Sequence, residues 1–296
     1  MRAWWKSRNG KGAKHNMPTY GMAIDLDRCI GCYNCQIACK DEHVGNEFLP
    51  IAISQPTFGQ FWLSIAENEQ CLDPSHFKVT YTPKLCNHCD DAACLKAAKN
   101  GAVYRRPDGI VIIDPQKAVG QKQLVDACPY GSIYWNEEKN VAQKCTFCAH
   151  LVDDGWKQPR CVQSCPMSCM HFGDLDDPNS KVSEFLAKNK TEVLEPEFKT
   201  NPKVSYAGLP KPHLAGTVRF GDTGDCAAKV KVTLTGPDGK KTEGVTDCFG
   251  DFEFRNVKKG KHKISYASHG YQPQSKSFSL DDDVSDLGEV SLAKAK

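Results

Sequence analysis

Four cysteines near the start of the chain have a spacing that suits metal chemistry. Cys29, Cys32, Cys35 and Cys39 stand in the sequence CIGCYNCQIACK, with two, two and three residues between them. With this spacing, three thiolates from one tight loop hold one [4Fe-4S] cluster, and the fourth thiolate reaches a second cluster. Zinc also binds four thiolates, but structural zinc sites do not need this spacing. We therefore expect iron-sulfur chemistry rather than zinc.

Further cysteines form two more blocks and the remnant of another. The second block contains Cys86, Cys89 and Cys94, and a lone Cys128-Pro129 follows it. The last block contains Cys145, Cys148, Cys161 and Cys165, and it ends in a Cys-Pro pair. Counting by the same spacing forward from Cys94 and back from Cys128 reaches residues that cannot hold iron, namely Ala98, Ala118, Gln121 and Leu124. The pattern predicts a four-block design from which one complete site is missing.

The missing site also indicates how the blocks pair. If blocks exchange their fourth ligands in pairs, every remaining triad finds a fourth thiolate only when the first block pairs with the last and the second with the third. This pairing predicts three [4Fe-4S] clusters. We name their ligands the first set (Cys29, Cys32, Cys35 and Cys165), the second set (Cys39, Cys145, Cys148 and Cys161) and the third set (Cys86, Cys89, Cys94 and Cys128).

The remaining cysteines and the nearby histidines receive no role in this scheme. Cys71, Cys169, Cys226 and Cys248 are expected to be free thiols that pack as small hydrophobic side chains. A disulfide between Cys226 and Cys248 is left open. His88 and His150 are expected to pack near the clusters rather than to bind iron, because the thiolates are already sufficient. No catalytic residue is expected on this chain.

Composition excludes several classes of protein. The 296 residues carry 38 Lys and Arg against 36 Asp and Glu, so no concentrated basic field for nucleic acid is present. No apolar run reaches the roughly 20 residues that a membrane span requires. The basic N-terminal segment lacks the apolar core of a signal peptide and a twin-Arg pair. Because many free thiols indicate a reducing compartment, we expect a cytoplasmic protein.

The elements that must position these cysteines point to an α+β protein. We expect a flexible extension at residues 1–19 and a double ferredoxin-like domain at residues 20–192, with a buried strand at residues 109–113. The prolines of residues 193–212 predict an extended connector.

Residues 213–296 have a different pattern. Val230, Val232 and Leu234 alternate with polar residues, as do Phe252 and Phe254, and a turn signal stands at residues 236–239. We expect an antiparallel, seven-stranded β-sandwich. Its spacing resembles immunoglobulin-like and carboxypeptidase regulatory-like modules, a resemblance that covers the fold alone.

The cysteine motifs together resemble a known family. The order CxxCxxCxxxC, CxxCxxxxC, CPYG and CxxC…CxxxCP, with QKCTFCAHLV, PRCVQSCP and FGDLDDPNSKV, resembles the iron-sulfur electron-transfer subunits of the dimethyl sulfoxide reductase family of molybdopterin enzymes. The resemblance covers about residues 20 to 190. It implies two ferredoxin-like halves that form an electron wire from a large catalytic subunit. Most such subunits carry four clusters, and the set missing here corresponds to the outermost one.

A narrower resemblance concerns the substrate. The missing site and the C-terminal sandwich together resemble the small subunits of pyrogallol-phloroglucinol transhydroxylases, a branch of this family. The resemblance implies a heterodimer with a large subunit that binds molybdenum with two pterin guanine dinucleotides and acts on polyhydroxylated aromatics, or a related phenol hydroxylase or dehydroxylase. This chain would be its non-catalytic electron-transfer subunit, and a soluble electron carrier is left open as a further partner.

Two alternatives remain. One is the iron-sulfur subunit of a respiratory reductase for sulfur, selenium or arsenic oxyanions, which hands electrons to another protein. The other is an adhesion or scaffolding protein with structural clusters, which would have to be stable without a large subunit.

Overall fold

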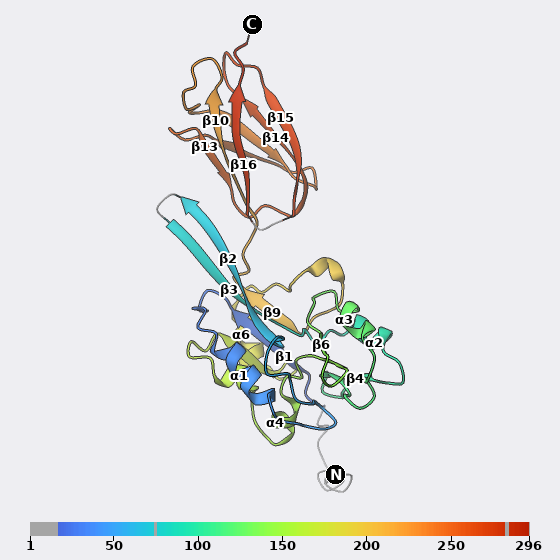
Figure 1. Ribbon diagram of the computed structural model, residues 1–296. Coiled ribbons are helices and arrows are strands. Elements are labelled where there is room, and N and C mark those ends of the chain that lie inside the picture. The colour runs from blue at the N-terminus through green and yellow to red at the C-terminus, as the bar shows by residue number, and fades with distance from the viewer. Residues whose placement is uncertain (1–16, 74–75, 282–283, 296) are drawn as a thin grey trace. The chain divides into compact units, whose positions relative to one another are not determined.

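The computed structural model describes residues 17–73, 76–281 and 284–295 (Figure 1). Two compact units make up the chain. The first comprises the residues up to Ala66 together with Tyr81–Gly208, and the second comprises Glu67–Thr80 and the residues from Leu209 onward. Of the extension expected at residues 1–19, residues 1–16 lie outside the described residues, and the first strand begins at Tyr20. Among the described residues, no helix is both long and apolar enough to cross a bilayer.

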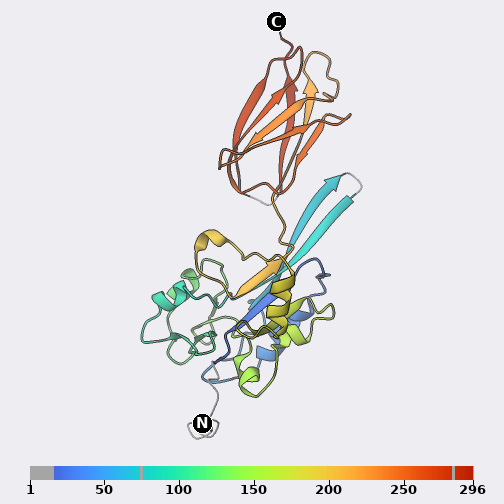
Figure 2. The same cartoon turned by 180° about the vertical axis from the view of Figure 1, so that it is seen from behind.

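The first unit is built around a three-stranded sheet. Its central strand β1 (Tyr20–Asp25) pairs antiparallel with β8 (Met170–Asp174) and parallel with β9 (Val204–Ala207). The apolar core of β1 is fully buried, as expected for a strand with neighbours on both edges. Helix α6 (Lys181–Lys188) packs on β8 and β1 (Figure 2), and the Ser180 side chain caps it by accepting a hydrogen bond from the Ser183 amide.

The segment expected as a connector contributes to this sheet. Within residues 193–212, the structure has a short 3-10 helix (Pro196–Phe198) and the strand β9. Tyr206 of β9 is fully buried and donates its hydroxyl hydrogen to the Pro83 carbonyl at 2.9 Å. The boundary predicted at residue 192 was therefore wrong, because the first unit extends to Gly208. The prolines flank a strand of four residues, which is too short to show an alternating pattern.

Two pairs of short helices carry or adjoin cysteines of the three sets. Helix α1 (Asn34–His43) packs against α5 (Arg160–Gln163), and α2 (Ala93–Ala97) packs against α3 (Gln123–Asp126). Helix α4 (Ala149–Asp153) follows the loop of Cys145 and Cys148. The first of these pairs brings together cysteines that lie far apart in the sequence.

The remaining strands between β1 and β8 in the sequence pair two by two. The pairs are β2 (Leu63–Asp73) with β3 (His76–Leu85), β4 (Val103–Arg105) with β5 (Val111–Ile113), and β6 (Tyr134–Asn136) with β7 (Val141–Gln143). Strand β5 confirms the buried strand predicted at residues 109–113.

Residues 213–292 fold into two sheets that contain seven strands within the described part of the chain. One sheet has the order β13–β10–β16 and the other β12–β11–β14–β15. Their bounds are β10 (His213–Phe220), β11 (Lys231–Thr235), β12 (Lys241–Val245), β13 (Asp251–Phe254), β14 (Gly260–Ala267), β15 (Gln274–Leu280) and β16 (Val284–Leu292). The residues predicted to face inward, such as Val232, Leu234 and Phe252, form one buried core.

The antiparallel prediction was wrong for one strand pair. The four-stranded sheet is antiparallel throughout, but β10 and β16 run parallel to each other. Parallel neighbours need a long connection, and the five intervening strands provide it. Turn signals in the sequence report only connections between successive strands, so they could not reveal this pair.

Candidate functional site

The three cysteine loops share one local turn. In each loop, the residue two positions after the first cysteine has a positive φ, and its amide donates a hydrogen bond to that cysteine sulfur. These pairs are Cys29 with Gly31 (φ 65°), Cys86 with His88 (φ 44°, 3.5 Å) and Cys145 with Phe147 (φ 51°, 3.4 Å). The turn points these amides at the sulfur of the first cysteine in each loop, where they stabilise negative charge.

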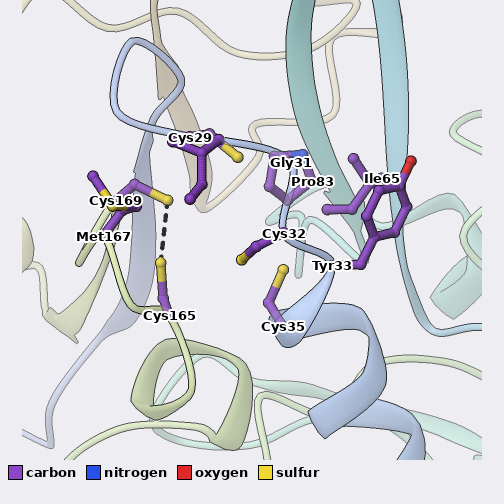
Figure 3. Close-up of a pocket in the computed structure, with 11 residues that line it drawn as sticks. Cys29, Gly31, Cys32, Tyr33, Cys35, Ile65, Pro83, Cys165, Met167 and Cys169 are labelled. Carbon is purple, nitrogen blue, oxygen red and sulfur yellow. Dashed lines mark hydrogen bonds between the residues drawn. The ribbon is translucent and has the colours of Figure 1, made fainter.

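The first set lines a single cavity (Figure 3). Cys29 and Cys32 come from the loop before α1, Cys35 from the first turn of α1, and Cys165 from the segment after α5. Cys32 is exposed, whereas Cys35 is buried. Cys169, which was expected to be a small hydrophobic side chain without a role, lines the same cavity. Sequence spacing offered no signal for it beyond the presence of a cysteine.

The second set lies deeper in the first unit. Cys39 stands on α1, Cys161 on α5, and Cys145 and Cys148 in the loop before α4. All four side chains are buried, with 5–7% of their surface exposed. Cys39 interacts electrostatically with Cys145 and Cys148, and Cys161 interacts with all three. The packing of α1 on α5 brings Cys39 and Cys161 together, and the loop before α4 adds Cys145 and Cys148.

The third set also lines a single cavity. Cys86 and Cys89 lie in the loop after β3, Cys94 on α2, and Cys128 just after α3. Apolar side chains of Val111 and Ile133 complete the wall. The contact between α2 and α3 therefore brings a fourth sulfur to the triad.

Burial makes these thiols poor acids unless a cation binds them. It raises the pKa of Cys35, Cys145 and Cys148 to about 12, and that of Cys89 and Cys94 to about 11. Iron binds thiolate, so loading these sites with iron must release protons. A multi-iron cluster supplies the positive charge that this many buried sulfurs need. The donor set fits such a group.

The shape of the sites argues against single zinc ions. Four sulfurs around one zinc lie about 3.8 Å from one another, given Zn–S bonds of about 2.3 Å in a tetrahedron. In the described part of the chain, no three Cys, His, Asp or Glu side chains converge closely enough to hold one ion. The cysteines of the first and third sets instead line cavities, as ligands of a wider cofactor would.

The three sets follow one another in space. Cys35 of the first set interacts electrostatically with Cys39 and Cys161 of the second set. Cys145 of the second set interacts with Cys86 of the third. The second set therefore lies between the other two, an order that the sequence could not provide.

The position of the missing site is filled with protein. Ala118 and Leu124 are fully buried in an apolar core that Ala98 also contacts. Gln121 is buried and exchanges hydrogen bonds with the Lys99 amide (2.9 Å) and carbonyl (3.2 Å). Gly120, two residues after Ala118, has a φ of 74°, so this loop keeps the turn of the cysteine loops without their sulfurs.

A buried lysine lies among the second and third sets. Lys144 is 2% exposed and its ammonium donates to the carbonyls of Val111 and Cys145, the latter at 3.0 Å. It interacts electrostatically with Cys94, Cys128 and Cys145. A buried cation is costly unless negative charge is close. The position of Lys144 directly before Cys145 in the sequence did not predict that its ammonium group would be buried near cysteines of two sets.

The other side chains behave mostly as expected. His88 is buried, stacks on Phe147 and accepts a hydrogen bond from the Val111 amide. His150 pairs with Glu42 at 3.0 Å. Cys226 and Cys248 are free thiols, and Cys248 is exposed, so it does not pack as a hydrophobic side chain. The side chain of Cys71 lies outside the described residues.

Comparison with known proteins places the chain in a family. A 4Fe-4S dicluster domain matches residues 77–175, and a carboxypeptidase regulatory-like domain matches residues 213–293. The chain is 38% identical to the pyrogallol hydroxytransferase small subunit of Pelobacter acidigallici, across 93% of this chain and 100% of that protein.

Two further relatives match a smaller part of the chain. A putative dimethyl sulfoxide reductase iron-sulfur subunit of Halobacterium salinarum is 35% identical, and a tetrathionate reductase subunit of Salmonella typhimurium is 36% identical. Each match covers 64% of this chain, with 79% of the first relative and 72% of the second. The chain therefore belongs to the iron-sulfur electron-transfer subunits of the dimethyl sulfoxide reductase family of molybdopterin oxidoreductases.

Proposed function

We propose that this chain is the three-cluster electron-transfer subunit of a heterodimeric molybdenum enzyme that acts on polyhydroxylated aromatics. The observation that carries the proposal is the similarity to the pyrogallol hydroxytransferase small subunit over 93% of this chain, which includes the sandwich. The filled fourth site supports it independently, since a wire without its outer cluster suits an enzyme that exports no electrons.

The residues of this chain would hold and insulate the clusters. The first, second and third sets would each bind one [4Fe-4S] cluster, in a double ferredoxin-like arrangement of the helix pairs. Loaded in this way, the sites would carry single electrons to and from the partner. The large subunit would hold molybdenum with two molybdopterin guanine dinucleotides and the substrate, and we place the complex in the cytoplasm.

The surface beside the first set suits the large subunit. Ile30 and Ile37 flank the exposed Cys32 in sequence, and 57% and 58% of their respective surfaces are exposed. Apolar side chains left in water beside a redox site favour a protein partner at that place. We expect Ile37→Asp to weaken co-purification of the two subunits. Val245→Asp, at a 62% exposed position in the sandwich, is the matched control and should leave co-purification unchanged.

The chemistry of the substrate agrees with a short wire. Moving a hydroxyl group from one phenol to another is redox-neutral overall, so the turnover needs no permanent outlet for electrons. A hydroxylase or dehydroxylase of the same class would need a soluble carrier. The end of the wire at the third set would be its docking point, because the second set is enclosed between the other two.

A respiratory reductase is the second candidate, because relatives at 35–36% identity include a tetrathionate reductase subunit. Assays of the native complex distinguish the two. Hydroxyl transfer between pyrogallol and phloroglucinol without an external electron donor supports the proposal. Turnover only of tetrathionate, selenate or arsenate with reduced viologen would refute it and establish the alternative.

A further inference from the structure

The first site contains more cysteines than one cluster can use. A [4Fe-4S] cluster takes four thiolates, yet five cysteines line this cavity (Figure 3). The fifth, Cys169, is 3% exposed. Its sulfur lies 3.3 Å from that of Cys165 and also hydrogen-bonds with the side chain of Cys29. Its side chain therefore contacts the sulfurs of two proposed ligands.

The backbone fixes Cys169 in this position. Ser168, in the left-handed region with a φ of 49°, donates its amide hydrogen to the Cys165 carbonyl at 3.2 Å, which closes a turn from Cys165 back to Cys169. The Cys169 carbonyl accepts a hydrogen bond from the Asp25 amide at 2.8 Å, which ties it to β1. Both cysteines are thus held at one corner of the cavity by the end of α5 and the start of β8.

We propose that Cys169 is an alternate iron ligand of the first cluster, able to replace Cys165 at the same iron. The inference rests on the proposed function, because it requires a cluster at this site. An iron held by the Cys165 sulfur would lie close to the Cys169 sulfur, because the two sulfurs are 3.3 Å apart. Either sulfur could then supply the one remaining bond that a four-thiolate cluster needs at this corner.

The exchange is balanced without any redox change. The bond from iron to the Cys165 sulfur breaks and a bond to the Cys169 sulfur forms. The proton of the Cys169 thiol passes to the Cys165 thiolate as that sulfur leaves. The oxidation level of the cluster is unchanged and no further reactant is needed. When Cys165 is absent, the same proton goes to solvent.

Iron content of variants in the full complex tests this assignment. Wild-type protein should bind about twelve irons per chain. Cys165→Ala and Cys169→Ala should each keep about twelve, while the double variant should fall to about eight. The first-cluster signal in electron paramagnetic resonance should shift in Cys165→Ala, because its ligand has changed. Cys32→Ala, which removes a ligand of the tight loop, is the control for full loss of that signal.

Three results would overturn the inference. One is complete loss of the first cluster in Cys165→Ala, as in the double variant. Another is a cluster in Cys165→Ala that has only three irons. Alternatively, Cys169→Ala alone would lose the cluster, which would make Cys169, rather than Cys165, the fourth ligand. A wild-type complex with fewer than about twelve irons would instead contradict the proposed function, so the two failures are distinguishable.

Discussion

Replacing Cys128 with alanine removes one ligand from the third set and from no other. Cys128 follows α3 and lines the cavity of Cys86, Cys89 and Cys94. The amides of Ser132 and Tyr130 hydrogen-bond to its sulfur, which fixes the direction of that ligand. The first set lines a separate cavity, and the second set is buried between α1, α5 and the loop before α4. We therefore expect Cys128→Ala to destroy the third cluster and to spare the other two.

The size of the effect follows from the ligand sets. Three sets of four cysteines hold about twelve irons, and loss of one cluster leaves about eight, a decrease of one third. Acid-labile sulfide should fall by the same fraction, and one of three cluster signals in the dithionite-reduced protein should disappear. Cys248→Ala, at an exposed cysteine of the sandwich, is the matched control and should lose no iron.

The same variant separates the candidate functions. Redox-neutral hydroxyl transfer should survive in Cys128→Ala, because it needs no electrons beyond the end of the wire. Reduction driven by an external dye through the third set should be abolished. Loss of the first-cluster signal with the third retained would refute the pairing of the second and third blocks, and retention of about twelve irons would remove Cys128 from the ligands.

Two further predictions concern Lys144 and the sandwich. Lys144→Met removes a buried positive charge near the second and third sets, so both potentials should fall by tens of millivolts in redox titrations, given that about 1.4 kcal/mol corresponds to about 59 mV per electron. Lys144→Arg, which keeps the positive charge, should keep both potentials close to those of the wild type. Unchanged potentials in Lys144→Met would contradict the role of the charge. Gly250 and Gly239 both have a positive φ, but a Cβ at Gly250 would stand 2.3 Å from the Val218 carbonyl oxygen and one at Gly239 would meet nothing within 4 Å. Denaturant unfolding should show a cost of about 1–2 kcal/mol for Gly239→Ala and about 1–3 kcal/mol more for Gly250→Ala; equal costs would refute the close contact.

Much of the site was predictable because the spacing of the cysteines along the sequence indicates which of them can bind one cluster together. A short loop such as residues 29–35 keeps its cysteines close together. The absence of cysteine at Ala118 and Gln121 limited which distant blocks could supply the fourth ligand of each cluster. In the structure, the four cysteines of the first and third sets each line one cavity, and those of the second set lie together in the core. Their assignment as iron ligands stays a prediction until iron is measured.

What the sequence did not reveal depends on contacts between distant segments. Cys169 stands beside Cys165 because a turn and a bond to β1 return it to the cavity, and no spacing rule encodes that return. Lys144 is an ordinary charged residue until packing buries it against the Val111 carbonyl of β5. Strand β9 and the parallel pairing of β10 with β16 arise from sheet edges far apart in the chain. Such features follow from tertiary packing rather than from local pattern.

The central claim is that this chain holds three [4Fe-4S] clusters and that its fourth site is filled by protein. Iron and acid-labile sulfide determined per chain in the anaerobically purified complex, with the iron of the large subunit counted separately, test it most directly. We expect about twelve irons and three spectroscopically distinct clusters on this chain. About sixteen irons would contradict the filled fourth site, and about eight would contradict one of the three ligand sets.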